Sequence, residues 1–179
     1  MGVMMFKYFE NPRAFAYMAA SGHACHFCKA THNCLDGAHF FGQDEIDAIC
    51  FSCMQAGRLI ELDISANEIN ISALDPILVD VEQVSNEITY CTPSVPTWQD
   101  SFWPIKNGRP YKFIKIASKL DYESKEQFID SLFENSNDPE WLWSILPDHK
   151  IANIKEGQYD LSCYLFKLEG DKLTTWDAN

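Results

Sequence analysis

The sequence predicts an α+β fold in which helices and short antiparallel strands are combined with a four-cysteine unit, and which ends in a β-hairpin. Three observations predict it: two C-x-x-C pairs in the first third of the chain, capped helix starts at Ser and Asp residues, and strand-like segments on both sides of Gly170. A chain of 179 residues can build a hydrophobic core that does not depend on a metal ion alone.

Two cysteine pairs with identical spacing are the most specific of these features. Cys25 and Cys28 form one pair, Cys50 and Cys53 form the other, and 21 residues lie between them. Two C-x-x-C turns can supply the four sulfurs of a tetrahedral zinc site, with Zn–S distances of about 2.3 Å. The spacing therefore predicts one structural Zn2+ in a treble-clef or zinc-ribbon unit. Four thiolates leave no open coordination position, so we expect this metal to support the structure rather than catalysis.

Alternatives to a four-cysteine zinc site stay open at the level of the sequence. The pairs could be reduced thioredoxin-like motifs or ordinary buried thiols, because free cysteine is among the most buried residue types. We expect Cys34 to stand outside the metal site. A histidine could also replace one sulfur, and the candidates are His23, His26, His32 and His39.

The net charge of -12 is concentrated in one part of the chain, which we call the acidic segment (Ala30–Ile105). Arg58 is its only basic residue. Its carboxylates are Asp36, Asp44, Glu45, Asp47, Glu61, Asp63, Glu68, Asp75, Asp80, Glu82, Glu87 and Asp100. A field of this sign repels nucleic acids and anionic membranes and speeds the encounter with a basic partner. Alternatively, the charge only keeps the protein in solution.

A basic run without an intervening carboxylate follows the acidic segment. Such a run could bind phosphate, but we expect it to form ion pairs with the acidic segment before it. We therefore expect neither a nucleic acid nor a membrane as a partner. The residues of the basic run are Lys106, Arg109, Lys112, Lys115 and Lys119.

In the first half of the chain, local patterns predict short elements. Residues 6–9 are rich in aromatic side chains and suit a short strand, and residues 15–19 have the spacing of a helical turn. Alternating apolar residues over 59–71 predict one or two short strands. An Asp-Pro pair has the form of an N-cap and a first helical residue, which predicts a helix over 75–90. The expected apolar face of this helix consists of Ile77, Val81, Val84 and Ile88.

Aromatic residues and a tight turn mark the middle of the chain. Two tryptophans and a phenylalanine lie within residues 98–103, a density that is typical of a core plug. The Asn-Gly pair at 107–108 predicts a turn into a strand over 109–117.

Helices and a hairpin are predicted for the remainder. Capping patterns open helices at 124–133 and 138–146. Strands at 159–166 and 172–176 flank a Glu-Gly-Asp turn and form the hairpin.

A change in composition near residue 120 divides these elements into two regions. Residues 1–120 form the zinc-binding core, and residues 121–179 add the helical segment and the β-hairpin. We expect both regions to pack on the same core.

The sequence lacks the motifs of common enzyme classes. It has no G-x-x-x-x-G-K-[ST] phosphate loop, no G-x-G-x-x-G dinucleotide motif and no G-x-S-x-G nucleophile turn. Ile49 precedes Cys50 where a nucleobase deaminase would have proline. We therefore expect that the protein is not an enzyme.

The cysteine content favours a reducing compartment. Seven cysteines, an odd number, and residues 1–15 without a charged and then apolar leader argue against a secreted disulfide scaffold. No apolar run approaches the roughly 20 residues of a membrane span. We expect a cytoplasmic protein.

Several short motifs together resemble one bacterial family. They are Phe6-Lys-Tyr, the two C-x-x-C pairs, Glu87-Ile-Thr-Tyr-Cys-Thr-Pro93, Thr97-Trp-Gln99, Trp103, Tyr164-Leu-Phe-Lys167 and Trp176-Asp177. With these motifs, almost the entire chain resembles the CbrC family of bacterial colicin-tolerance proteins. In that family a further cysteine pair often follows the Tyr-Leu-Phe strand. Here Leu168-Glu-Gly170 contains no cysteine, so we expect no second metal site there.

The resemblance implies that the protein protects a bacterium against a protein toxin. Our first hypothesis is an immunity-type protein that binds a cognate toxin or secreted effector, such as a nuclease, through its acidic surface. The alternative is a zinc-ribbon regulatory or adaptor module that binds a cellular protein in a stress or envelope response. Nucleic-acid binding through the basic run ranks last. The candidate partner contacts are Asp44, Glu45, Asp47, Asp80, Glu82, Glu87, Trp98 and Trp103.

Overall fold

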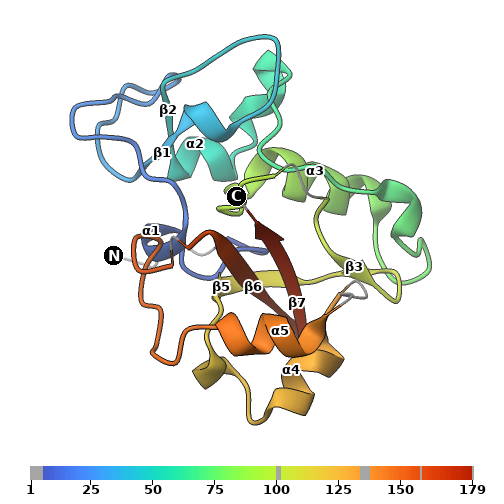
Figure 1. The fold of residues 1–179 in the computed structure, drawn as a ribbon. Coiled ribbons are helices and arrows are strands. Elements are labelled where there is room, and N and C mark those ends of the chain that lie inside the picture. The colour runs from blue at the N-terminus through green and yellow to red at the C-terminus, as the bar shows by residue number, and fades with distance from the viewer. Residues whose placement is uncertain (1–5, 100–101, 134–137, 158, 179) are drawn as a thin grey trace.

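The architecture is built around a three-stranded antiparallel sheet in the order β5–β6–β7 (Figure 1). The predicted α+β fold class, with its four-cysteine cluster and C-terminal hairpin, is confirmed. The strands are β5 (Lys112–Ile116), β6 (Leu161–Leu168) and β7 (Asp171–Ala178). The structure is a computed structural model, and it describes residues 6–99, 102–133, 138–157 and 159–178.

The hairpin between β6 and β7 has a two-residue turn. Glu169 and Gly170 both have positive φ, at 51° and 90°, as a type I′ turn requires. The predicted strands at 159–166 and 172–176 are therefore confirmed, with ends shifted by one or two residues.

β6 is buried on both of its faces. Tyr164 and Phe166 belong to the larger hydrophobic core, whereas Cys163 and Leu165 belong to the smaller one. This alternation follows from the geometry of a strand, in which successive side chains point to opposite faces. β6 follows residue 120 and pairs with β5, which precedes it, so the sheet joins the two regions of the chain.

Two short helices cover the smaller core (Figure 1). They are α4 (Lys125–Ser131) and α5 (Pro139–Ile145), and a 3-10 turn at Lys119–Asp121 precedes them. Both predicted caps are confirmed: the Ser124 side chain accepts a hydrogen bond from the backbone of Gln127, and Asp138 accepts one from Trp141. Each helix ends before its predicted last residue.

The four-cysteine segment, which we call the metal unit, lies at the other end of the molecule from these helices (Figure 1). Its two strands form an antiparallel ladder, with Cys34 opposite Cys50. The elements of the unit are β1 (Cys34–Asp36), β2 (Ala48–Cys50), α2 (Phe51–Gln55) and 3-10 turns at Gly37–His39 and Arg58–Leu62.

Helix α3 (Val81–Cys91) begins five residues later than predicted. Its N-cap is Asp80, whose carboxylate accepts a hydrogen bond of 2.9 Å from the backbone N–H of Gln83. Asp75 instead closes a separate turn, because its Oδ1 accepts from the backbone of Ile77 at 2.8 Å. Asp75 and Asp80 can each cap a turn, and the sequence pattern did not show which of the two begins the helix.

The later start changes the apolar face of α3. Val84 and Ile88 are buried, as predicted. Ile77 lies before the helix and is 90% exposed, so its predicted place on the apolar face is wrong. The helix packs against α2 and the 3-10 turn that follows α2.

The prediction of strands over 59–71 is wrong. Arg58–Leu62 and Ile71–Ala73 form 3-10 turns, and only isolated bridges lie between them. Gly57 and Asp63 flank the first turn with φ values of 69° and 53°. These left-handed residues reverse the chain direction, so Leu59 and Ile64 are buried from a turn rather than from a strand, whereas Ile60 and Ile71 are exposed.

The predicted strand at residues 6–9 is reduced to a single parallel bridge. Phe9 pairs with Phe113, and the backbone of Phe113 donates to Tyr8 at 2.8 Å. The helical turn expected at 15–19 is shifted to α1 (Pro12–Phe15), because Asn11 caps it.

The Asn-Gly turn predicted at 107–108 is confirmed. It joins β3 (Ile105–Lys106) to β4 (Arg109–Pro110), with φ values of 53° and 75° at its two residues. A Cβ atom on Gly108 would lie 2.3 Å from the Cβ of Asp75, so the turn requires glycine for packing as well as for conformation.

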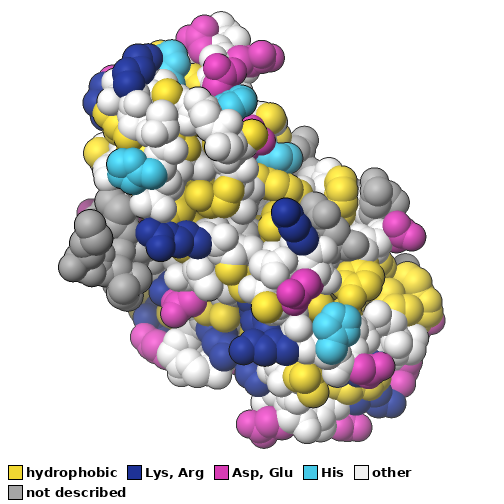
Figure 2. Space-filling model, turned by 90° about the vertical axis from the view of Figure 1, so that its left-hand side faces the viewer, with side chains coloured by type: hydrophobic (Ala, Val, Ile, Leu, Met, Phe, Trp, Pro, Cys, Tyr) yellow, Lys and Arg dark blue, Asp and Glu magenta, His cyan; other side chains and the backbone are white. Residues whose placement is uncertain are grey.

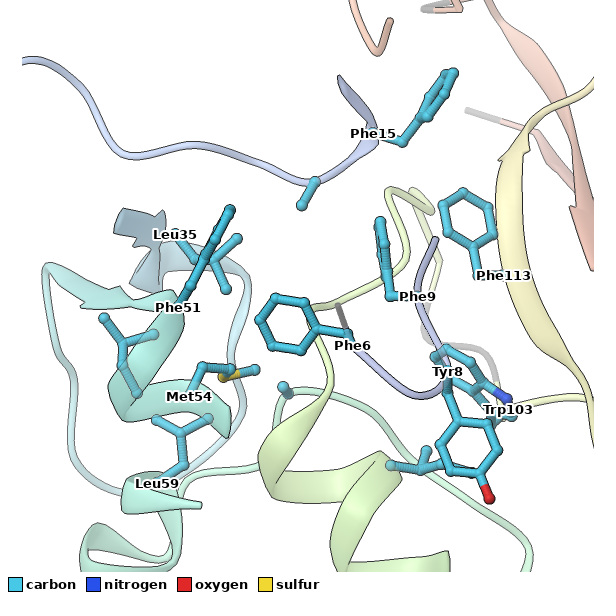
Figure 3. Packing of buried hydrophobic residues seen from close by; sticks show 14 of the residues in the cluster. Phe6, Tyr8, Phe9, Phe15, Leu35, Phe51, Met54, Leu59, Trp103 and Phe113 are labelled. Atoms are coloured by element: carbon cyan, nitrogen blue, oxygen red, sulfur yellow. The ribbon is translucent and has the colours of Figure 1, made fainter. Parts of the chain in front are cut away.

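A chain of aromatic contacts connects the metal unit to the sheet (Figure 3). The Phe6 ring lies between Phe51 of α2, at a centroid distance of 5.5 Å, and Phe9. Phe9 contacts Phe113 of β5 at 4.7 Å, and Phe113 contacts Phe166 of β6 at 5.4 Å. The N-terminal segment therefore fills the space between the two ends of the molecule.

Within the described ranges, no helix combines the length and the apolar character needed to cross a membrane.

Because Phe113 joins four aromatic neighbours and is fully buried, Phe113→Ala should lower the free energy of unfolding by about 3–5 kcal/mol. Ile77→Ala is the control and should change it by less than about 0.5 kcal/mol, because Ile77 is exposed. Chemical denaturation followed by circular dichroism measures both. A loss below about 1 kcal/mol for Phe113→Ala would contradict the packing described above.

Candidate metal centre and acidic surface

The four predicted cysteines come together from two structural contexts. Cys25 and Cys28 lie in a tight turn, closed by a 3.0 Å hydrogen bond from the Lys29 backbone to the carbonyl of Cys25. Cys50 is the last residue of β2, and Cys53 lies in the first turn of α2. A turn with the first pair, a two-stranded ladder that ends at Cys50 and a short helix that carries Cys53 thus follow one another along the chain.

The geometry of the four sulfurs fits a metal ion. All four Sγ atoms lie within 4.8 Å of one another, and those of Cys28 and Cys50 are 3.5 Å apart. A tetrahedral site with metal–sulfur distances of about 2.3 Å places its sulfurs about 3.8 Å apart. Cys28 is exposed and the other three cysteines are buried. The cluster could therefore hold one metal ion.

Neither the fifth nearby cysteine nor any histidine belongs to this group within the described residues. The Cys34 thiol lies 3.3 Å from the carbonyl oxygen of Ala30 and 3.6 Å from that of His32, to which it can donate. Four thiols thus complete the ligand set without a contribution from Cys34.

The protein environment shifts the pKa values of three of these thiols in different directions. Burial raises the pKa of Cys25, but hydrogen bonds from the backbone of Cys28, Cys50 and Phe27 outweigh it and lower the pKa to about 6. Burial raises the pKa values of Cys50 and Cys53. Crowding four thiolates into one small volume is unfavourable without a cation, and a bound metal ion supplies the compensating charge.

The candidate carboxylates of the acidic segment lie on two different elements. Asp80 also serves as the N-cap of α3, and Asp100 lies outside the described residues. Figure 2 shows carboxylates at the upper end of the molecule, which the metal unit forms. The candidates fall into two groups: Asp44, Glu45 and Asp47 in the exposed loop before β2, and Asp80, Glu82 and Glu87 at α3.

The prediction that the basic run pairs with the acidic segment is wrong. Each of its five residues forms an ion pair with a carboxylate outside the acidic segment. Three of these carboxylates belong to the hairpin or the N-terminal segment, which lie beside β3, β4 and β5. Basic and acidic side chains accordingly lie next to one another over the lower part of Figure 2. The pairs are Lys106 with Asp171, Arg109 with Glu169, Lys112 with Glu10, Lys115 with Asp121 and Lys119 with Asp148.

This pairing leaves Arg58 as the one counterion of the acidic segment among the described residues. Among the ion pairs of the described residues, only the pair between Arg58 and Glu61 involves one of its carboxylates. The negative charge of the segment is therefore directed to solvent.

The two candidate tryptophans have different surroundings. Trp103 is 4% exposed and donates its Nε1–H to the carbonyl oxygen of Tyr111 at 2.8 Å, so it is part of the core. Trp98 is 48% exposed. The core-plug prediction holds for Trp103 alone, and only Trp98 is accessible to a partner.

Sequence reasoning missed two buried polar residues that hold the Trp98 loop in place. Asp177 accepts hydrogen bonds from the backbone N–H groups of Trp98 and Gln99, at 2.5 and 3.3 Å. The Asn67 amide nitrogen lies within hydrogen-bond distance of the carbonyl oxygens of Ile88, Thr92 and Pro93, to which it donates. The Trp176-Asp177 motif was a signal for the first, whereas no local pattern marks Asn67.

Comparison with known proteins identifies a family. The profile of an uncharacterised protein family, UPF0167, matches residues 3–174. The chain belongs to this family. No curated protein and no solved structure gave a significant match.

The metal centre predicts a clear difference between two cysteine variants. Cys25→Ser should lose the metal ion and the stability that it provides, which reaches about 4 kcal/mol when free metal is at roughly 1,000 times its Kd. Cys91→Ser is the control, because Cys91 lies outside the cluster and should keep one metal ion per chain. Elemental analysis and thermal unfolding of the purified proteins measure both effects. A full equivalent of metal in Cys25→Ser would contradict the assignment.

Proposed function

We propose that this chain is an immunity-type protein of the CbrC kind, which binds a bacterial protein toxin through its acidic segment in the cytoplasm and thereby neutralises it. The observation that carries the proposal is the uncompensated charge of the acidic segment, where Arg58 alone opposes twelve carboxylates. Such a surface attracts a basic partner over a distance of about one Debye length and speeds its association. Nuclease toxins are suitable partners, because a channel that binds nucleic acid is basic.

Family membership supports the same proposal. CbrC belongs to UPF0167, and all the motifs on which the resemblance rests except Trp176-Asp177 lie within the matched range 3–174. A protein that acts by binding needs no catalytic constellation, in agreement with the expectation from the sequence.

We also propose that the metal is Zn2+, since a closed set of four thiolates is typical of structural zinc. In this role it would keep the acidic loop before β2 in a defined position. The backbone N–H of Gly37 donates to the backbone carbonyl oxygen of Asp47 at 3.0 Å, and a Cβ atom on Gly37 would lie 1.8 Å from the carbonyl oxygen of Ile46. The loop is thus tightly packed where it rejoins β2, whose last residue is Cys50.

The proposal is tested first by affinity pull-down from the native host and then by association kinetics with the recovered partner. One stoichiometric basic toxin or effector is the expected partner. Neutralising the acidic loop in Asp44→Asn/Glu45→Gln/Asp47→Asn should slow association about tenfold at low salt, and added salt should reduce the difference.

A matched variant controls for total charge. Glu123→Gln/Asp130→Asn/Asp160→Asn removes the same number of exposed carboxylates outside the acidic segment, and should change the association rate less than about threefold. Equal rates for the two variants would contradict a specific role of the acidic loop. Recovery of housekeeping proteins alone would contradict the immunity proposal and favour the regulatory or adaptor module.

A further inference from the structure

A small cavity opens between the metal unit and the sheet, away from the cysteines. Its volume is about 190 Å3, and it is lined by residues 38–41, 66–68, 94–95, 97–99 and 102–104 together with Phe166 of β6 and Thr175 of β7. Ligand pockets for whole small molecules usually measure about 300–1,000 Å3. The cavity therefore has the size of a single long side chain rather than of a nucleotide or a cofactor.

The C-terminal hairpin holds one wall of the cavity in place. Besides the backbone of Trp98 and Gln99, the Asp177 carboxylate contacts the hydroxyl of Tyr164 at 2.8 Å. The same hydroxyl lies 3.0 Å from the carbonyl oxygen of Pro96. Because Asp177 and Tyr164 are buried, these bonds are shielded from water and keep the loop in one conformation.

The other end of the loop is held equally firmly. The Ser94 hydroxyl donates to the carbonyl oxygen of Ala66 at 2.7 Å. The backbone N–H of Trp103 donates to the carbonyl oxygen of Glu68 at 2.7 Å. The walls of the cavity are thus preorganised, which lowers the entropic cost of binding.

The lining of the cavity combines aromatic rings with one carboxylate. Phe41, Trp98 and Phe102 line it and are exposed, so their rings are accessible to a ligand. Glu68 is the only carboxylate among its described lining residues, and no lysine or arginine lines it. His39 stacks on Tyr17 at a centroid distance of 3.6 Å, and burial lowers its pKa.

We propose that this cavity binds the guanidinium or ammonium group of a basic side chain presented by a protein partner. Aromatic faces attract such cations, and a carboxylate at the same site adds a charge-assisted hydrogen bond. The occupant comes from a protein because the cavity holds one side chain and adjoins the acidic segment, which brings basic proteins to this surface. This inference rests on the proposed function, for which it names an anchor point.

The test uses a capped amino acid as a probe of the side chain. N-acetyl-arginine methylamide should bind saturably to the full-length protein, with a Kd of about 1–10 mM, as measured by NMR titration. N-acetyl-citrulline methylamide has nearly the same shape without the charge and should bind at least about tenfold more weakly.

Two substitutions locate the binding, and each has a matched control. Trp98→Ala and Glu68→Gln should each lower the affinity for the arginine probe about fivefold to tenfold. Both keep the loop anchors, since Trp98 and Glu68 use backbone atoms for them. Trp141→Ala removes a tryptophan of the same 48% exposure, and Glu82→Gln removes an exposed carboxylate of the acidic segment. Neither residue lines this cavity, and neither change should affect the probe.

The outcomes separate this inference from the proposed function. Absence of saturable binding, equal binding of the citrulline probe, or equal effects of Glu68→Gln and Glu82→Gln would overturn the cation site and leave the toxin experiment unaffected. If Trp98→Ala weakens the binding of the arginine probe but not the binding of the toxin recovered by pull-down, the cation is a free small molecule. The proposed protein source of the cation is then overturned. Probe binding without any recovered toxin overturns the proposed function instead.

Discussion

The fold depends on one strand that is buried on both faces. β6 contributes Tyr164 and Phe166 to the larger core and Cys163 and Leu165 to the smaller one. A strand in this position has to be apolar along most of its length, and its displacement would expose both cores. The remaining elements are placed relative to it, with α4 and α5 on one face and the aromatic contacts to the metal unit on the other.

The same sheet determines the charge distribution of the surface. Its hairpin presents Glu169 and Asp171 to the basic run, and other carboxylates outside the acidic segment complete the pairing. Apart from the largely buried pair between Lys115 and Asp121, these ion pairs are at least partly exposed, and such pairs contribute only about 0–1 kcal/mol each to stability. Their larger consequence is electrostatic, because the basic residues that could have neutralised the acidic segment are already paired.

Two kinds of internal restraint produce the surfaces that we assign to binding. In our proposal a metal ion in the cysteine cluster restrains the acidic loop before β2, and the buried Asp177 holds the loop that carries Trp98. Both loops are irregular in structure, so without these restraints their ordering would have to accompany binding and would reduce affinity. Several residues of the motifs behind the family resemblance, including Asp177 and Trp103, have this positioning role.

The local sequence alone was enough to predict the two cysteine pairs, the caps at Ser124 and Asp138, and the turn at Gly170. These features depend on backbone geometry within a few positions. Only the tertiary structure decided that Asp80 rather than Asp75 caps α3, that residues 59–71 fold as turns, and which carboxylates pair with the basic run. It also decided that Trp103 is buried while Trp98 is exposed. Each of these outcomes depends on which distant segments pack together, and burial and ion pairing are properties of that packing rather than of local sequence.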